Sequence, residues 1–155
     1  MLLDTNILLR TIQPAHPHHV LATDAAAKLR WLGIVAQVRP QNIVELWAVA
    51  TRPAAQNGLG LSPERAATEV GKLLYFCKLL PDNPRIHPIW ESLVVEHRVS
   101  GKPTHDARIV AAMKSHGLTN ILTFNGADFT RFPGITVVHP SDLVRKSLGY
   151  DILGK

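Results

Sequence analysis

Short apolar blocks alternate with longer stretches of helical spacing, and this pattern predicts an α/β protein. Four blocks read as strands, at Met1–Leu3, Ile34–Val38, Asn120–Thr123 and Ile135–Val138. Between them, apolar residues recur every three or four positions, as they do on one face of an amphipathic helix. Strands separated by helices favour a short, mainly parallel central sheet with helices on both faces.

Capping and turn residues indicate where the predicted helices begin and end. Ser62-Pro63-Glu64 is a typical helix start, with Ser as N-cap, Pro at the first position and Glu in the first turn, and this helix is predicted to reach Leu79. Gly33 and Gly117 are placed to end helices. The other helices are predicted at Asn6–Thr11, His18–Leu32, Gln41–Thr51, Pro88–Val99 and Thr104–His116 (capped by Thr104), with a last helix capped by Ser141.

Length and composition fit one folded domain that needs no cross-links. The chain has 155 residues and is 46% hydrophobic, and we expect a single domain over residues 1–148 with a fraying tail at 149–155. Cys77 is the only cysteine, which excludes an internal disulfide, and its apolar neighbours favour a core position. No apolar run approaches the roughly 20 residues that span a bilayer, and the N-terminus lacks the basic leader of a signal peptide. We therefore expect a cytoplasmic protein.

The charge balance is basic, with 17 Lys and Arg against 12 Asp and Glu and a net charge of +5. Such a balance suits a polyanion, because phosphate contacts release condensed counterions. The basic residues are scattered, however, so charge alone does not distinguish a nucleic-acid binder from an ordinary surface. Arg10, Arg108 and Arg131 lie near the acids discussed next and either contact phosphates or are solvated.

Two acids stand in apolar surroundings where a lone carboxylate is costly. Asp4 ends the first predicted strand, at the edge where parallel sheets bind ligands, although it could instead cap the following helix. Asp106 shares a helix face with Ile109, Val110 and Met113. Its alternative role, stabilising the first turn through the helix dipole, contributes roughly 0.3–1 kcal/mol, which is less than burial costs. The pattern therefore favours a ligand site.

Two further acids are candidates for the same site. Glu45 lies in the middle of an apolar helix, where the alternative is a solvent-facing side chain. Asp128 follows the strand Asn120–Thr123 after a short turn that Phe124 and Phe129 could anchor to the core. The alternative for Asp128 is solvation of an Asn-Gly turn.

If the four acids converge, their repulsion must be relieved by protons or by a cation. Hard oxygen ligands select Mg²⁺ or Mn²⁺, and such an ion can orient a water and stabilise charge on a phosphodiester. No zinc signature competes, because the eight histidines lack Cys partners, and no Ser or Cys triad is supported.

The four acidic segments together resemble the PIN domain in order and spacing, and most of all the VapC-type toxins of bacterial toxin–antitoxin pairs. The matching segments run from Leu2 to about Pro140: Leu2-Leu3-Asp4-Thr5-Asn6, Asn42-Ile43-Val44-Glu45, His105-Asp106-Ala107-Arg108-Ile109-Val110-Ala111-Ala112, and Leu122-Thr123-Phe124-Asn125 with Asp128-Phe129.

This resemblance implies a three-layer α/β/α PIN-like fold and a set of roles. Asp4, Glu45, Asp106 and Asp128 would be the catalytic, metal-holding acids, and Asn6, Thr123 and Asn125 would hold those acids or the substrate. It also implies Mg²⁺ or Mn²⁺ as cofactor, cleavage of RNA, a homodimer, and a VapB-like antitoxin that blocks the acidic site.

We therefore expect a metal-dependent endoribonuclease. One alternative is a non-catalytic module that holds a metal and binds nucleic acid or protein. The other is a phosphatase of the haloacid dehalogenase type, which also begins with a strand ending in Asp. That class needs a second Asp two residues on, where this chain has Asn6.

Overall fold

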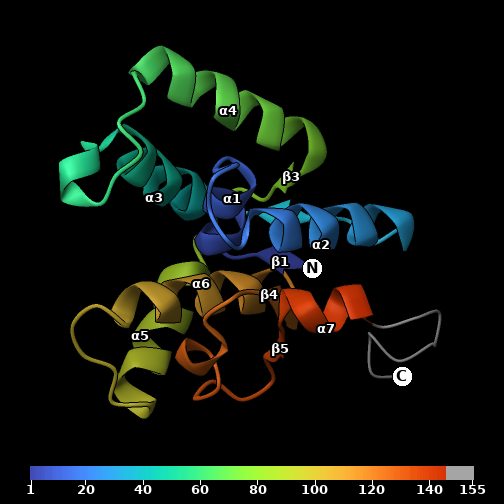
Figure 1. Ribbon diagram of the computed structural model, residues 1–155. Coiled ribbons are helices and arrows are strands. Elements are labelled where there is room, and N and C mark those ends of the chain that lie inside the picture. The colour runs from blue at the N-terminus through green and yellow to red at the C-terminus, as the bar shows by residue number, and fades with distance from the viewer. Residues whose placement is uncertain (146–155) are drawn as a thin grey trace.

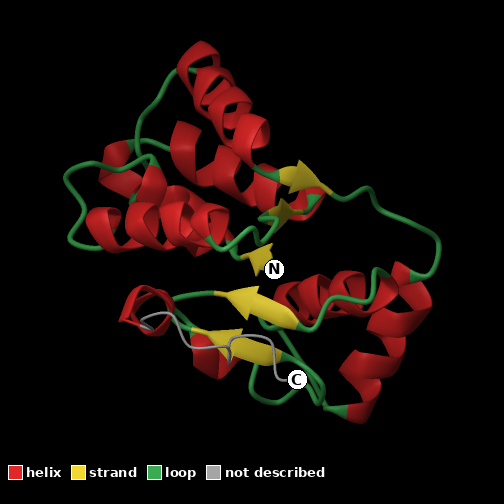
Figure 2. Cartoon of the chain, turned by 90° about the vertical axis from the view of Figure 1, so that its right-hand side faces the viewer, coloured by secondary structure: helices red, strands yellow, loops and turns green. Residues whose placement is uncertain are grey.

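The computed structural model describes residues 1–145, which form a five-stranded parallel sheet in the order β3-β2-β1-β4-β5. The strands are short and the central one lies nearest the N-terminus, as Figure 2 shows. Their bounds are β1 (Leu2–Leu3), β2 (Gln37–Val38), β3 (Lys78–Leu79), β4 (Asn120–Leu122) and β5 (Thr136–Val138).

Seven α-helices connect and flank these strands within the described residues (Figure 1). They are α1 (Thr5–Thr11), α2 (His19–Trp31), α3 (Pro40–Thr51), α4 (Pro63–Phe76), α5 (Ile86–Glu96), α6 (Thr104–Ser115) and α7 (Pro140–Arg145). The described residues also contain two 3-10 turns, η1 (Ala54–Gln56) and η2 (Gly126–Asp128). None of these helices is long and apolar enough to cross a membrane.

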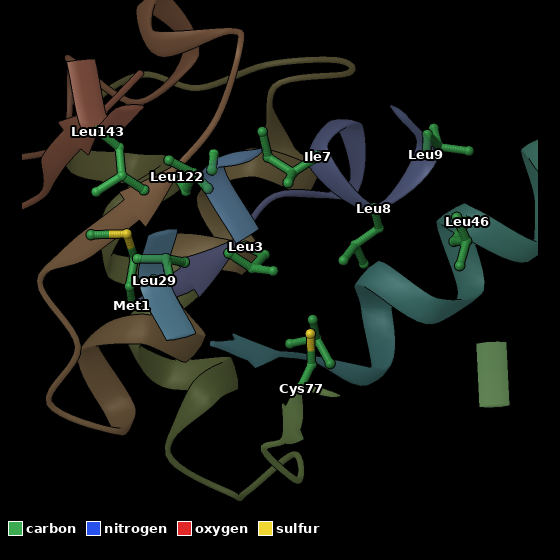
Figure 3. Packing of buried hydrophobic residues seen from close by; sticks show 12 residues of the cluster. Met1, Leu3, Ile7, Leu8, Leu9, Leu29, Leu46, Cys77, Leu122 and Leu143 are labelled. Carbon is green, nitrogen blue, oxygen red and sulfur yellow. The ribbon is translucent and has the colours of Figure 1, made fainter. Parts of the chain in front are cut away.

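Side-chain alternation along the strands divides the core into two layers. Leu3 and Leu122 point to one face of the sheet, where they pack with residues of α1, α2, α3 and α7 (Figure 3). Leu2 and Ile121 point to the opposite face, which α5 and α6 cover. Neighbouring residues of a strand face opposite ways, so each strand contributes to both layers. The predicted three-layer α/β/α fold is confirmed.

The fifth strand, β3, was not predicted. Helix α4 ends at Phe76, whereas the sequence predicted that it would continue to Leu79. Cys77 is extended, with φ −111° and ψ 136°, and buried, so its predicted core position is correct. The next residues pair with β2: the amide of Lys78 donates to Ala36 and that of Leu80 to Val38, both at 2.9 Å. This pairing satisfies backbone groups that a longer helix would otherwise have satisfied.

Other predicted boundaries moved by a few residues. Of the predicted strand Ile34–Val38 only Gln37–Val38 forms a strand, and Val35 is exposed. Helices α5 and α7 begin at Ile86 and Pro140, before the predicted Pro88 and Ser141, and the Ser141 amide donates to Nδ1 of His139. Thr104 is the first residue of α6 rather than its N-cap. The predicted domain end at residue 148 and the tail at 149–155 lie outside the described residues.

Candidate functional site

The register of β1 and β4 places two polar residues side by side at the carboxyl end of the sheet. Leu3 pairs with Leu122, so the residues that follow, Asp4 and Thr123, are neighbours. The Asp4 amide continues the ladder by donating to the Leu122 carbonyl at 3.0 Å. Ligands of open parallel sheets bind beyond this edge.

Asp4 is buried and held by two side-chain donors. Its Oδ2 atom accepts from the Thr123 hydroxyl at 2.6 Å and from the Asn6 amide at 2.9 Å. Asn6 is fixed in turn, because it donates to Thr123 Oγ1 and its Oδ1 accepts from the Phe124 amide. Asp4 occupies the N-cap position of α1 without a side-chain capping hydrogen bond, so helix capping does not account for it.

The pKa of Asp4 is raised above its usual value, chiefly because burial disfavours the charged form. The Thr123 hydroxyl and the Thr5 amide oppose this shift, whereas the negative charges of Glu45 and Asp128 add to it. Asp4 therefore lies within the electrostatic reach of two of the other predicted acids.

Glu45 is half-buried on α3, and each of its carboxylate oxygens has a donor. Oε2 accepts from the Thr5 hydroxyl at 2.7 Å, and Oε1 accepts from the Gln41 amide at 2.8 Å. The Thr5 hydroxyl itself accepts from Asn42 Nδ2 at 3.1 Å. Glu45 is thus oriented by two donors, so the alternative of a solvent-facing side chain does not hold.

Asp106 lies half-buried in the first turn of α6, with a pKa raised from 3.8 to about 6. Burial is the largest cause, and the charges of Asp128, Asp4 and Glu45 follow, while His105 acts weakly in the opposite direction. Among residues 1–145 no Lys or Arg forms an ion pair with it. A purely structural role for Asp106 would need such a basic partner, and residues 1–145 do not supply one.

Asp128 ends the 3-10 turn η2 and is exposed. The predicted anchoring of this loop is confirmed for Phe129, which is 1% exposed, while Phe124 is half-buried. The Asn125 side chain is exposed; its backbone amide donates to Thr123 Oγ1 at 3.0 Å. Asp128 therefore reaches the site from a turn rather than from the sheet itself.

The structure brings all four predicted acids into one electrostatic neighbourhood, since the charges of Asp128 and Glu45 act on both Asp4 and Asp106. The donor set consists of carboxylate oxygens and fits a hard divalent cation. Within residues 1–145, no three His, Cys, Asp or Glu side chains are close enough to hold one ion directly. Mg²⁺ usually keeps several waters and needs only one or two direct carboxylates, so the set still fits it.

Three supporting residues were missed in the sequence. Thr5 and Gln41 donate to Glu45, and Asn42 orients Thr5. Spacing offered a partial signal, because Gln41 precedes Glu45 by one helical turn and Thr5 adjoins Asp4. That Thr5 would turn toward Glu45, 40 positions away, depends on how α1 packs on α3.

The three arginines near the acids differ in their surroundings. Arg108 donates to Gln41 Oε1 and to Asp82 Oδ2, both at 2.9 Å. Arg10 donates to Gln13. Arg131 is exposed. Of the three arginines, Arg131 alone matches the prediction of an ordinary solvated side chain, because Arg10 and Arg108 donate to protein acceptors.

Comparison with known proteins gives a family and a set of similar folds. The family model for the PIN domain matches residues 1–135. No curated protein sequence matches the chain. DNA-bound VapBC from Salmonella typhimurium is similar at a TM-score of 0.67 and 21% identity, with 90% of this chain and 96% of that chain covered. VapBC-1 from nontypeable Haemophilus influenzae has the same TM-score at 16% identity, with 90% and 97% covered.

A third similar structure is a toxin described as cleaving the Sarcin-Ricin loop, VapC20 from Mycobacterium tuberculosis. It has a TM-score of 0.59 and 18% identity, with 82% of this chain and 91% of that chain covered. At these identities the structural likenesses concern the fold. The family model, in contrast, covers most of the sequence, and so this chain belongs to the PIN domain family.

Proposed function

We propose that this protein is a metal-dependent endoribonuclease that hydrolyses RNA phosphodiesters and serves as the toxin of a toxin–antitoxin pair in the cytoplasm. The observation that carries the proposal is the mutual action of four carboxylates at the carboxyl edge of the sheet. Burial raises the pKa values of Asp4 and Asp106, the neighbouring negative charges raise them further, and a bound cation would relieve that repulsion. Groups with such shifts gather at functional sites.

The similar structures support the choice of RNA and of a protein partner. One is a toxin described as cleaving the Sarcin-Ricin loop, and others are complexes of VapB with VapC. The basic net charge of +5 suits a polyanionic substrate. The alternative of a haloacid-dehalogenase-type phosphatase is disfavoured by the PIN family match and by Asn6 at the position of that class's second Asp.

In the proposed mechanism the chain's own residues hold and orient the reacting groups. Asp4, Asp106 and Asp128 would hold Mg²⁺ or Mn²⁺, directly or through water. When bound, such an ion supplies charge neutralisation on the phosphate oxygens and acidifies water. Glu45 either completes the oxygen set or accepts the proton of the attacking water. Asn6 and Thr123 keep Asp4 in place, and Thr5 and Gln41 do the same for Glu45.

A VapB-like antitoxin and a second copy of the chain are the partners we propose. A groove of about 790 Å³ lies between α2 and α4 and extends to α1. Its lining includes Tyr75 and Phe76, which are 84% and 63% exposed. Exposed apolar surface of this kind marks protein interaction sites. Val44 and Trp47 on α3 lie outside the groove lining and offer apolar surface for a homodimer.

The test is cleavage of a mixed RNA pool by the purified chain with Mg²⁺ or Mn²⁺, with EDTA and Asp4→Asn as controls. We expect cuts that disappear in both controls. Asn keeps an oxygen that can accept from Thr123 and Asn6, so Asp4→Asn should fold normally by circular dichroism. Its cleavage should fall by roughly 100-fold or more, since a metal contributes several kcal/mol to the transition state.

Cleavage by Asp4→Asn at the wild-type rate would remove the four acids from the mechanism. A second outcome distinguishes the non-catalytic alternative. If the folded wild type binds Mn²⁺ and RNA but makes no cuts in any pool, a metal-holding binding module describes the protein better. A folded wild type that neither binds Mn²⁺ nor cleaves RNA would reject both the nuclease and the binding module.

A further inference from the structure

A network of two arginines and one aspartate lies beside Glu45. The guanidinium of Arg39 is 1% exposed, and it contacts Asp82 Oδ1 at 2.7 Å and the Pro81 carbonyl at 3.2 Å. Asp82 uses its other oxygen, Oδ2, for Arg108 at 2.9 Å. Asp82 thus anchors Arg108 to a buried cation on the neighbouring segment, and this fixes one end of the Arg108 guanidinium.

The other end of Arg108 determines the orientation of an amide. Its NH1 atom donates to Gln41 Oε1 at 2.9 Å. A guanidinium has only donors, so the oxygen of Gln41 must face Arg108 and its NH₂ group must face away. That NH₂ group donates to Glu45 Oε1 at 2.8 Å and to the His105 carbonyl at 3.1 Å. If the Gln41 amide were reversed, its NH₂ group would face the donors of Arg108, and its oxygen would face the Glu45 carboxylate.

We propose that Arg108, held by Asp82, is a positioning residue that acts through Gln41 to fix the carboxylate of Glu45. This inference rests on the proposed nuclease function, in which Glu45 serves the reaction. It also assigns Arg108 a role other than a contact to RNA phosphate. The bridging geometry carries the assignment. Both terminal nitrogens of Arg108 donate to protein acceptors, and one of these acceptors, Gln41, donates in turn to Glu45.

The role requires the forked shape of Arg. A lysine ammonium is a point charge and does not reach Asp82 and Gln41 with two fixed, parallel donors. If Arg108 contacted phosphate only through its charge, Lys would replace it well. The variants Arg108→Met and Arg108→Lys therefore separate the two roles. Arg85, exposed and close to Asp82 in the sequence, provides the matched control as Arg85→Met.

The first measurement reports on Gln41 without any turnover. In ¹⁵N-labelled protein we expect the side-chain NH₂ resonances of Gln41 to shift and exchange faster in Arg108→Met and Arg108→Lys than in the wild type. Arg85→Met should leave them unchanged. Unaltered Gln41 resonances in both Arg108 variants would overturn the proposal, whether or not the protein cleaves RNA.

The second measurement is a double-mutant cycle on kcat with Arg108→Met and Gln41→Ala. Each single change should lower kcat about tenfold, as loss of a residue that orients a ligand does, and the double variant should be no slower than the slower single one. Arg108→Lys should recover little of the loss. If Arg108→Met lowers the melting temperature strongly, Arg108→Lys takes its place in the cycle.

The third measurement is RNA binding in EDTA at several salt concentrations. Positioning predicts the wild-type KM, Kd and salt dependence in Arg108→Met. A phosphate contact predicts weaker binding and a salt slope smaller by about one. That second pattern, or single effects that multiply to about 100-fold in the double variant, would overturn the inference. A wild type that cleaves no RNA, with Gln41 still responding to Arg108, would instead count against the nuclease function alone.

Discussion

The four acids of the candidate site fall into two pairs with different support. The hydrogen-bonded pair, Asp4 and Glu45, follows β1 and β2 and receives donors from Thr123, Asn6, Thr5 and Gln41. The open pair, Asp106 and Asp128, lies at the start of α6 and in η2, and among residues 1–145 neither carboxylate accepts a hydrogen bond. Side-chain donors hold the carboxylates in one half of the site, whereas no donor among residues 1–145 holds those in the other half.

This difference has an electrostatic consequence. The Thr123 hydroxyl partly offsets the burial of Asp4, while Asp106 has no such donor, and its pKa is about 6. A carboxylate that is destabilised by its neighbours gains most when a cation arrives. The hydrogen-bonded pair is therefore suited to hold a fixed geometry, and the open pair to respond to metal.

After the loss of an acid itself, the largest expected effect comes from removing a donor of the hydrogen-bonded pair. Thr123→Val removes the bond to Asp4 Oδ2, deprives the Asn125 backbone amide of its acceptor, and leaves Asn6 Nδ2 with Asp4 as its one remaining acceptor. We expect RNA cleavage to fall by roughly 10–100-fold, as for other residues that orient a ligand. Cleavage assays of Thr123→Val beside Thr68→Val, an exposed threonine on α4, measure this. Equal activities of the two variants would mean that Asp4 needs no support.

A smaller and opposite effect is expected in the open pair. Asp106→Asn removes a charge that burial disfavours and that three neighbouring acids repel, so without metal it should raise stability at pH 7 by about 1 kcal/mol after solvent screening. For a chain of this size that corresponds to about 2–4 °C in melting temperature. Mn²⁺ should stabilise the wild type and not the variant. Thermal melts in EDTA and in Mn²⁺ test both statements, and a destabilised apo variant would contradict the first.

The same carboxylate predicts a pH dependence. Because the pKa of Asp106 is raised from 3.8 to about 6, the folded state binds more protons than the unfolded state between these values. The stability that this group contributes is therefore fully present below about pH 3.8 and is lost as pH rises through about 6. The difference between the unfolding free energies of wild type and Asp106→Asn should change across this window and stay constant above it. Denaturant titrations in EDTA from pH 4 to 8 measure it, and a constant difference would refute the shift.

The smallest effect is expected at Asn125, which the family resemblance gives as a residue that holds the acids or the substrate. Its side chain is exposed, and it serves Thr123 through the backbone amide, which any residue except Pro supplies. Asn125→Ala should change cleavage by less than about threefold. A loss comparable to that of Thr123→Val would show that the Asn125 side chain contacts the substrate.

Local patterns in the sequence were enough for much of this molecule. The layered α/β fold followed from apolar spacing, and the capping signal at Ser62 was accurate, since its Oγ atom accepts from the Arg65 amide. β3 escaped prediction because Lys78–Leu79 is two residues long and exposed, so only pairing with β2 makes it a strand. The identity of the four acids came from motif order, while the support of Glu45 by Thr5 and Gln41 had only a partial signal in the residue spacing.

What the sequence determined by itself was therefore the elements other than β3, the family, and which carboxylates are candidates, because these depend on local spacing and residue type. The tertiary structure decided the register that sets Thr123 beside Asp4, the turn of Thr5 toward Glu45, and the bridge from Asp82 through Arg108 to Gln41. These contacts join residues 26 to 119 positions apart. Their energies depend on distances of about 3 Å and on the direction of each donor, and packing alone fixes both.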